Sequence, residues 1–424
     1  MPRPKPTQKA GTTKAVVAVA SVRERLKLER RSAHSNASGT TTSAATPSPN
    51  PHPTTCTFSQ RPTRLKGCGT PRVRTGELVS PVMSTAPGNK PKALVTGGAG
   101  FIGSHLCEAL LAAGWEVFAL DDLSTSSGEN VAHLTERWDF HLVVDSVLQP
   151  AVVNELVHKC EVVYHLAAAV GVRLIVEQPV HTLVTNVRGT ELVLEHCNRF
   201  RKRVLIASTS EVYGDHRDEV PLAENSRRIY GPTTARRWAY ADAKAMDELL
   251  SLAYNQERGL DCVIVRLFNT VGPRQSGQYG MVIPRFVERA VAGEPLEVHG
   301  DGTQTRCFCH VADAVRALTG LMDDRRISGE IFNVGSTRQI RILDLAQRVL
   351  EMTGSSSDVV YVPYDEVYGQ GIEDMAHRIP STEKVHGVIG WKPSLDLDVI
   401  LADVIKYSRT HGLKPLPEPQ AIET

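Results

Sequence analysis

The sequence lacks the long apolar runs and the cysteine framework that mark membrane and secreted proteins. No apolar run approaches the ~20 residues that a helix needs to cross a bilayer, and no secretory signal is recognisable. The eight cysteines form no disulfide-like pattern, and Cys307 and Cys309 alternate along an expected strand without a second pair to complete a zinc site. We therefore expect a cytoplasmic protein with reduced, partly buried cysteines and no metal.

The first 82 residues are poor in acidic side chains. They contain 14 Lys and Arg against 3 Asp and Glu, and residues 35–53 are almost entirely Ser, Thr, Ala, Asn, His and Pro. Such a stretch buries too little apolar surface to offset the entropy of ordering, so we expect a disordered basic tail over residues 1–82. It is a transit segment, a basic arm for nucleic acid or an acidic partner, or sequence upstream of a true start at Met83. The last interpretation is favoured, because the folded body begins soon after Met83.

Residues 92–121 are the most informative segment. They read KALVTGGAGFIGSHLCEALLAAGWEVFALD: an apolar strand, a glycine turn, an amphipathic helix and a second strand that ends on Asp121. The glycines let backbone N–H groups approach a pyrophosphate, whose charge the helix N-terminus favours. Asp121 would accept hydrogen bonds from a ribose 2′-hydroxyl and repel a 2′-phosphate. This order predicts binding of NAD rather than NADP.

Strands and helices go on alternating after Asp121. We expect strands at 140–144, 161–166, 204–207 and 262–267, and helices at 151–158 and 180–199. Repeated units of this kind predict an α/β fold with a Rossmann-type doubly wound parallel sheet, which binds ligands beyond the carboxyl ends of its strands. We expect an NAD-binding domain over residues 92–271. Residues 272–415 would form mainly a smaller, mixed substrate-binding domain, with a strand near 330–334 that returns to the main sheet.

Two polar segments suggest chemistry. STSEVYG (208–214) follows the strand at 204–207, and YADAK (240–244) opens a helical run. Residues four apart share one helix face, so Lys244 can lie near the Tyr240 hydroxyl, where its charge favours the phenolate. Tyr240 could then take the proton from a hydroxyl group while hydride leaves the same carbon for NAD, with Thr209 holding that hydroxyl. Without the other motifs, Tyr240 and Lys244 would be interpreted as two neighbouring side chains on the exposed face of a surface helix.

GGAGFIG, STSEVYG, YADAK and RLFNTVGPR together resemble the extended short-chain dehydrogenase/reductase superfamily, and within it the NAD-dependent nucleotide-sugar epimerases, dehydratases and decarboxylases. The resemblance spans residues 92–407. It implies an enzyme with a tightly held NAD, reduced and reoxidised in one cycle, and a nucleoside-diphosphate sugar substrate. It also implies a homodimer. Separately, we expect neither membrane nor nucleic acid as a partner of the folded body.

The same resemblance assigns site residues. Asn269 and Arg306 would contact the sugar diphosphate, for which the arginine fork is suited. The residues expected to contact the cofactor are Gly97, Gly100, Phe101, Ile102, Gly103, Asp121, Asp145, Tyr240 and Lys244.

Ser210 and Glu211 distinguish the branches of the family. The 4-epimerases usually lack an acid at the position of Glu211, and glucose 4,6-dehydratases carry Thr-Asp-Glu where this chain has Thr-Ser-Glu. Thr-Ser-Glu resembles UDP-glucuronate decarboxylases and, less closely, GDP-mannose dehydratases. EDMAHRIP (373–380) resembles the His-Arg-x-Pro segment of those decarboxylases. Arg378 would orient a substrate carboxylate or relay a proton, assisted by Glu211; the other interpretation is a linker arginine with no catalytic role. Decarboxylation of UDP-glucuronate to UDP-xylose is therefore the favoured function.

The chain also departs from the decarboxylase pattern. Residues 166–179 lack the proline-rich sequence usual in those enzymes. The catalytic helix has YADAK where those enzymes often have YDEGK. UDP-glucose 4-epimerase is therefore the close alternative, and an NDP-glucose 4,6-dehydratase is third. A non-catalytic NAD-binding or RNA-binding scaffold is disfavoured, because Thr209, Tyr240 and Lys244 are all present.

Overall fold

The computed structural model describes residues 90–171, 178–217, 220–235, 237–277, 281–363 and 378–412. The basic tail predicted for residues 1–82 lies outside these ranges, as do residues 373–377 of the EDMAHRIP segment. Within the described ranges, no helix is both long enough and apolar enough to span a bilayer.

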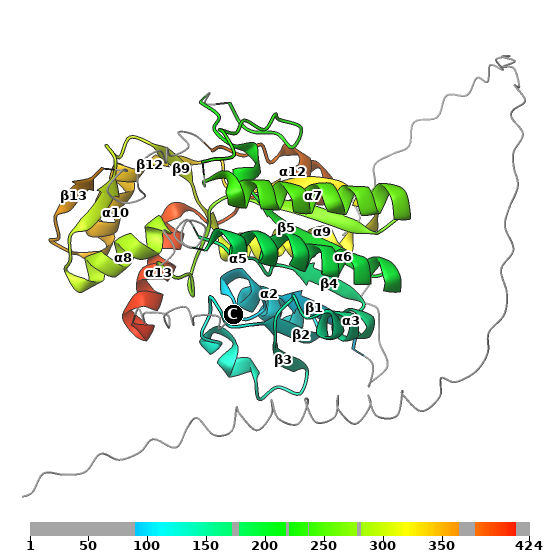
Figure 1. Ribbon diagram of the computed structural model, residues 1–424. Coiled ribbons are helices and arrows are strands. Elements are labelled where there is room, and N and C mark those ends of the chain that lie inside the picture. Colours follow the sequence, from blue (N-terminus) through cyan, green and yellow to red (C-terminus); the bar gives the residue numbers. More distant parts are fainter. Residues whose placement is uncertain are drawn as a thin grey trace, which may run out of the picture. The chain divides into compact units, whose positions relative to one another are not determined.

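Residues 86–424 contain a seven-stranded sheet in which all neighbouring strands are parallel; Figure 1 labels five of its strands, β1 to β5. In spatial order the strands are β11 (Glu330–Val334), β6 (Cys262–Leu267), β5 (Arg203–Thr209), β4 (Val162–His165), β1 (Lys92–Thr96), β2 (Glu116–Asp121) and β3 (Phe140–Val144). The predicted Rossmann-type fold is confirmed, and the strand at 330–334 does pair with β6. The strand order reverses between β1 and β4, where sheets of this kind open a crevice for ligands.

Helices cover both faces of the sheet, because its strands are apolar on both sides. On one face, α2 (Phe101–Ala112), α9 (Val311–Asp323) and α12 (Glu383–Ile389) enclose a core. On the other face, α3 (Pro150–Lys159), α6 (Gly189–Phe200) and α7 (Trp238–Arg258) enclose a second core. Short 3₁₀ turns are η1 (Glu129–Leu134), η3 (Ser210–Tyr213) and η4 (Arg325–Ile327).

The helix predicted over residues 180–199 differs from the observed one. It consists of α5 (Pro179–Leu183), a π-helical turn η2 (Val184–Arg188) and then α6. The turn holds Asn186 against the loop after β4: Ala169 N donates to Asn186 Oδ1 at 2.7 Å, and Asn186 Nδ2 donates to the Ala169 carbonyl at 3.3 Å. Turns of this kind occur often at functional sites.

A third core lies beside the main sheet, at the left in Figure 1, around Phe286, Leu345 and Ile400. Its elements are α8 (Val282–Ala292), β8 (Leu296–His299), β9 (Thr305–Cys307), β12 (Gln339–Arg341), α10 (Ile342–Thr353), β13 (Val359–Val362) and α13 (Leu397–His411). Two short strands, β7 (Thr270–Val271) and β10 (Cys309–His310), pair with each other. The domain boundary at residue 272 stays a prediction, because contacts join residues 86–424 in one compact unit.

The six cysteines in the described ranges are free thiols, and all are buried. Cys307 and Cys309 were expected along one strand, but they belong to two short strands, β9 and β10, which pair with different partners. Burial raises the pKa of each of these two thiols to about 12, so both stay protonated near neutral pH. They are small core side chains.

Candidate active site

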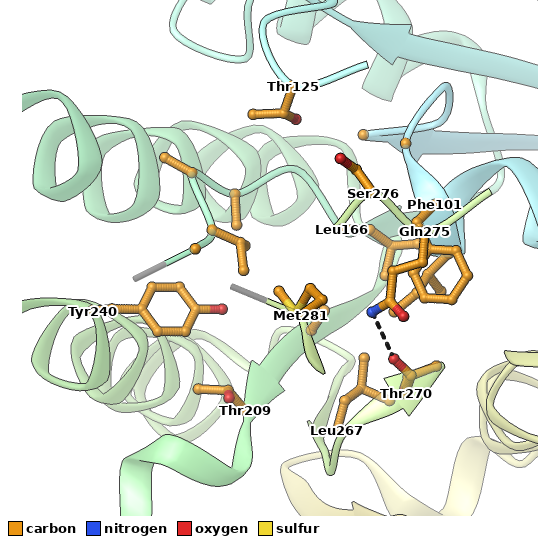
Figure 2. A pocket seen from close by; sticks show the side chains of 18 of the residues that line it. Phe101, Thr125, Leu166, Thr209, Tyr240, Leu267, Thr270, Gln275, Ser276 and Met281 are labelled. Atoms are coloured by element: carbon orange, nitrogen blue, oxygen red, sulfur yellow. Dashed lines mark hydrogen bonds between the residues drawn. The ribbon is translucent and has the colours of Figure 1, made fainter. Parts of the chain in front are cut away.

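A cavity of about 930 Å³ lies beyond the carboxyl ends of the sheet strands. All fifteen site residues assigned from the sequence line it: Gly97, Gly100, Phe101, Ile102, Gly103, Asp121, Asp145, Thr209, Ser210, Glu211, Tyr240, Lys244, Asn269, Arg306 and Arg378. Figure 2 shows the hydroxyls of Tyr240 and Thr209 projecting into this space from α7 and from the end of β5, with Phe101 and Gln275 across from them. The fold therefore brings every predicted residue to one place.

The glycine turn between β1 and α2 leaves no room for side chains. Gly97 has φ +70°, in the left-handed region that favours glycine. A Cβ on Gly97 would lie 2.9 Å from Ala167 N, and one on Gly103 would overlap the Gly97 carbonyl oxygen. No side chain caps α2, and its first turn holds no acidic residue. Its N–H groups are therefore available to an anion in the cavity.

Asp121 ends β2 with a buried carboxyl group that is held in place by the backbone. Ala99 N donates to Oδ2 and Leu123 N to Oδ1, each at 2.9 Å. Burial raises the pKa of this carboxyl, and the backbone hydrogen bonds act in the opposite direction. Asp145, after β3, accepts from Ser146 N at 2.8 Å. Both acids thus face the cavity in fixed orientations.

Tyr240 and Lys244 lie one turn apart on α7, as predicted, and both side chains are buried. Burial, followed by the negative charges of Glu211 and Asp247, raises the pKa of Tyr240 well above its ordinary value. Lys244 Nζ donates to Asp247 Oδ2 at 2.9 Å. The predicted action of Lys244 on the phenol stays a prediction, since a carboxylate shares the charge of this lysine. The available signal for Asp247 was its place three residues after Lys244, a spacing that lets opposite charges meet.

Glu211 and Arg378 meet in the cavity although they are far apart in the sequence. Glu211 Oε1 lies 3.5 Å from Arg378 Nη1, and both side chains are mostly buried. Two backbone bonds hold the segment that follows Arg378: Leu222 N donates to the Ile379 carbonyl at 2.7 Å, and Ser381 N donates to the Leu222 carbonyl at 2.9 Å. The pair therefore depends on tertiary contacts.

Thr209 and Ser210 form the corner at the end of β5. Glu211 N donates to Thr209 Oγ1 at 3.2 Å, so Thr209 caps η3. The Thr209 hydroxyl group projects into the cavity (Figure 2), and its hydrogen is left to donate to another acceptor. Ser210 is buried at the cavity wall.

Arginines line the cavity on the side of the third core. Arg306 is buried on β9, where its Nη1 donates to the Thr305 carbonyl at 2.7 Å. Asn269 adopts φ +34°, an uncommon value for a residue other than glycine, and its Nδ2 donates to the Cys307 carbonyl at 2.9 Å. Arg285 also lines the cavity, as does Arg274, which is paired with Glu108 of α2 at 2.6 Å; neither was singled out from the sequence. The arrangement suits an anionic ligand.

Behind the cavity wall, His165 at the end of β4 bridges two threonines. Its Nδ1 lies 2.8 Å from Thr96 Oγ1, and its Nε2 lies 3.1 Å from Thr190 Oγ1. Burial, together with the charge of Lys244, lowers the pKa of His165 to about 3. The imidazole is therefore neutral at physiological pH.

Comparisons with known proteins decide the family. Residues 93–335 match the model of the NAD dependent epimerase/dehydratase family. A UDP-N-acetyl-alpha-D-glucosaminuronate decarboxylase of Bacillus cytotoxicus is 40% identical over 321 residues, which cover 76% of this chain and 98% of that protein. The chain belongs to the NAD-dependent epimerase/dehydratase family. UDP-glucuronic acid decarboxylase 1 of Xenopus tropicalis is 33% identical over 330 residues, or 78% of this chain and 75% of that protein.

Solved structures of the family agree with the fold. The UDP-glucuronic acid 4-epimerase of Bacillus cereus, in complex with UDP-glucuronic acid and NAD, matches 75% of this chain and 99% of that chain, with a TM-score of 0.68 and 28% identity. The predicted class, an NAD-dependent epimerase, dehydratase or decarboxylase, is confirmed at the level of the family.

Proposed function

We propose that the protein is an NAD-dependent decarboxylase of a UDP-linked uronic acid, and that it converts UDP-glucuronate to UDP-xylose. The pairing of Glu211 with Arg378 in the cavity that Tyr240 also lines is the observation that carries the proposal. A guanidinium can receive a carboxylate through two parallel hydrogen bonds, and a uronic acid presents such a carboxylate. A 4-epimerase that acts on an uncharged sugar such as that of UDP-glucose needs neither the acid nor the arginine for its hydride transfers.

The residues on the glycine side of the cavity fit NAD. The tight turn at Gly97 and Gly103 and the uncapped start of α2 suit its pyrophosphate, and the fixed carboxyl of Asp121 suits a ribose hydroxyl. Phe101, Ile102 and Asp145 would complete the contacts. Bound there, NAD would supply hydride transfer from and to the sugar C4 and, in its oxidised form, a positive charge.

Tyr240 would act as the general base at the C4 hydroxyl, with Thr209 donating a hydrogen bond that holds this oxygen. The pKa of Tyr240 is raised by burial and by two carboxylates. Proton transfer to the phenolate therefore depends on positive charge nearby, and Lys244 supplies such a charge one turn away on α7.

The substrate's own chemistry then leads to decarboxylation. Oxidation at C4 makes the uronate a β-keto acid. Its C5–C6 bond breaks, C6 leaves as CO₂, and the bonding electrons form an enolate across C4 and C5. Arg378 would orient the departing carboxylate, and Glu211 would assist delivery of the proton to C5. Tyr240 would return its proton to the C4 oxygen as the product forms.

The anionic part of the substrate would lie against the segment 272–415 and the end of β6. Arg306 and Asn269 line that part of the cavity and would contact the diphosphate. Two uronates are candidates. The relative with 40% identity is named for an N-acetylated substrate, whereas the one with 33% identity is named for UDP-glucuronic acid.

The test offers the purified protein UDP-glucuronate, UDP-N-acetylglucosaminuronate, UDP-glucose and dTDP-glucose separately and identifies the products by NMR. Release of CO₂ with formation of a UDP-pentose supports the proposal. Interconversion of UDP-glucose and UDP-galactose alone would replace it by the 4-epimerase, and a 4-keto-6-deoxy product by the dehydratase. Tyr240→Phe should lower kcat by about 10²–10⁴-fold and retain NAD. Tyr361→Phe, at an exposed position of β13, is the matched control.

We also propose a homodimer. Val180, Leu183 and Val184 on α5 and η2, and Met246 and Leu249 on α7, are exposed apolar side chains, and the two helical segments are in contact. A second copy related by a two-fold axis would cover this patch with the same patch.

A charge in this patch should separate the subunits. Leu249→Glu is expected to halve the mass measured by light scattering while the circular dichroism spectrum stays unchanged. Val399→Glu, which charges an exposed residue of α13, should leave the mass unaltered. A wild-type protein with the mass of one chain would end the dimer proposal.

A further inference from the structure

Asp247 lies on the buried side of α7, one turn beyond Lys244. The two side chains form an ion pair of 2.9 Å in which the lysine is 3% exposed and the aspartate 0%. In a site with so little water, a carboxylate at this distance offsets much of the field of the ammonium group. We propose that Asp247 is a positioning residue, which holds Lys244 Nζ and limits the positive charge that this lysine exerts on Tyr240. The inference rests on the proposed acid–base role of Tyr240.

The three residues share one face of the helix. Lys244 comes four residues after Tyr240 and three before Asp247, and both spacings place side chains next to each other. Lys244 therefore stands between the phenol and the carboxyl group and can serve either one. In the structure its hydrogen bond goes to Asp247.

Burial opposes ionisation of the Asp247 carboxyl group. Burial raises its pKa, whereas the charge of Lys244 and the hydroxyl of Thr190 lower it. Oδ1 has no hydrogen-bond partner among the residues that the structure describes. A buried carboxylate whose one direct hydrogen bond comes from Lys244 depends on that bond to keep its charge, and the hydroxyl of Thr190 acts in the same direction.

The other charged groups near this cluster are paired or neutral. On α7 itself, Glu248 accepts from Arg266 of β6 through both oxygens, at 2.9 and 2.7 Å. On η3, Glu211 acts on Tyr240 but faces Arg378. On β4, His165 is neutral and lies 3.1 Å from Thr190 Oγ1 on α6. Asp247 is the carboxylate that contacts Lys244 directly.

The test measures ionisation of Tyr240 without substrate. The ultraviolet tyrosinate signal of each protein is titrated against the same protein carrying Tyr240→Phe, so that the difference belongs to residue 240. In Asp247→Asn the amide keeps a hydrogen-bond acceptor for Lys244 but loses the charge, and the titration should move to lower pH by about one unit, a tenfold gain in phenolate. The acid limb of kcat/KM should move in the same direction. Asp242→Asn removes an exposed acid from the same helix and should shift neither.

Thr190→Val supplies a second test that disturbs packing less. Loss of the hydroxyl should favour the neutral form of Asp247 and move the titration of Tyr240 in the same direction, by less. An unchanged titration in Asp247→Asn overturns the proposal. If that variant does not fold, an unchanged titration in Thr190→Val overturns it. Failure of the proposed function would be seen differently, as absence of turnover of any uronate while the titrations still shift.

Discussion

The two sides of the cavity are built in different ways. The side of Gly97, Gly103 and Asp121 comes from one continuous strand–turn–helix–strand unit, and its shape is that of the backbone. The opposite side takes Glu211 and Arg378 from segments far apart in the sequence, and backbone bonds between residues 222 and 379–381 help to bring them together. A binding surface shaped by the backbone can bind the ligand that all members of a family share. A binding surface formed by side chains from distant segments can change with one substitution. The first side therefore suits a common cofactor, and the second suits selection among substrates and reactions.

Removal of the guanidinium should affect the substrate side alone. Arg378→Gln leaves a uronate carboxylate without its charge-assisted bonds, which contribute about 1.5–3 kcal/mol, so kcat/KM should fall by about 10–150-fold. Arg378→Lys keeps the positive charge but not the planar guanidinium group, so it should recover part of the lost kcat/KM. Steady-state kinetics with the uronate, and calorimetry with NAD, give both values. An equal loss of NAD affinity would show that the two sides are not independent.

Addition of one methyl group should affect the cofactor side. In Gly103→Ala the new Cβ would overlap the Gly97 carbonyl, so the turn must shift, at a cost of about 1–3 kcal/mol in stability together with weaker NAD binding. Gly387→Ala places its Cβ in open space within α12 and should be neutral or stabilising by up to about 1 kcal/mol. Chemical denaturation and NAD titration measure the two effects. Equal results for both variants would contradict the assigned role of the backbone.

The same contrast explains how much could be predicted from the sequence. The strands at 140–144, 262–267 and 330–334 have the predicted bounds, because their apolar runs and turn residues are local signals. The glycine turn and Asp121 were predicted for the same reason. The π-turn at 184–188 was not, because it accompanies the contact of Asn186 with a loop on another element.

Pairings between charged side chains were the hardest to predict. The motifs place Lys244 beside Tyr240 but do not reveal its bond to Asp247. Likewise, Glu211 and Arg378 each have a sequence signal, yet their approach depends on backbone bonds between residues 222 and 379–381. Spacing on one helix predicts which residues can meet, and competition among partners in the folded core decides which do.

The smallest expected effect concerns His165, which contacts Thr96 at the end of β1 and Thr190 on α6. Its pKa is about 3 when folded, against an ordinary value of about 6.5. Between these values the unfolded chain binds a proton that the folded chain excludes, so the stability due to neutral His165 is present above pH 6.5 and is lost as the pH falls towards 3. From pH 7.5 to 5.5, the wild type should lose about 1 kcal/mol more of unfolding free energy than His165→Gln, which keeps hydrogen-bonding groups but does not titrate. His386→Gln changes an exposed histidine and should follow the wild type. If His165→Gln instead follows the wild type, this imidazole is protonated in the folded protein at pH 5.5, and its charge would also act on Lys244.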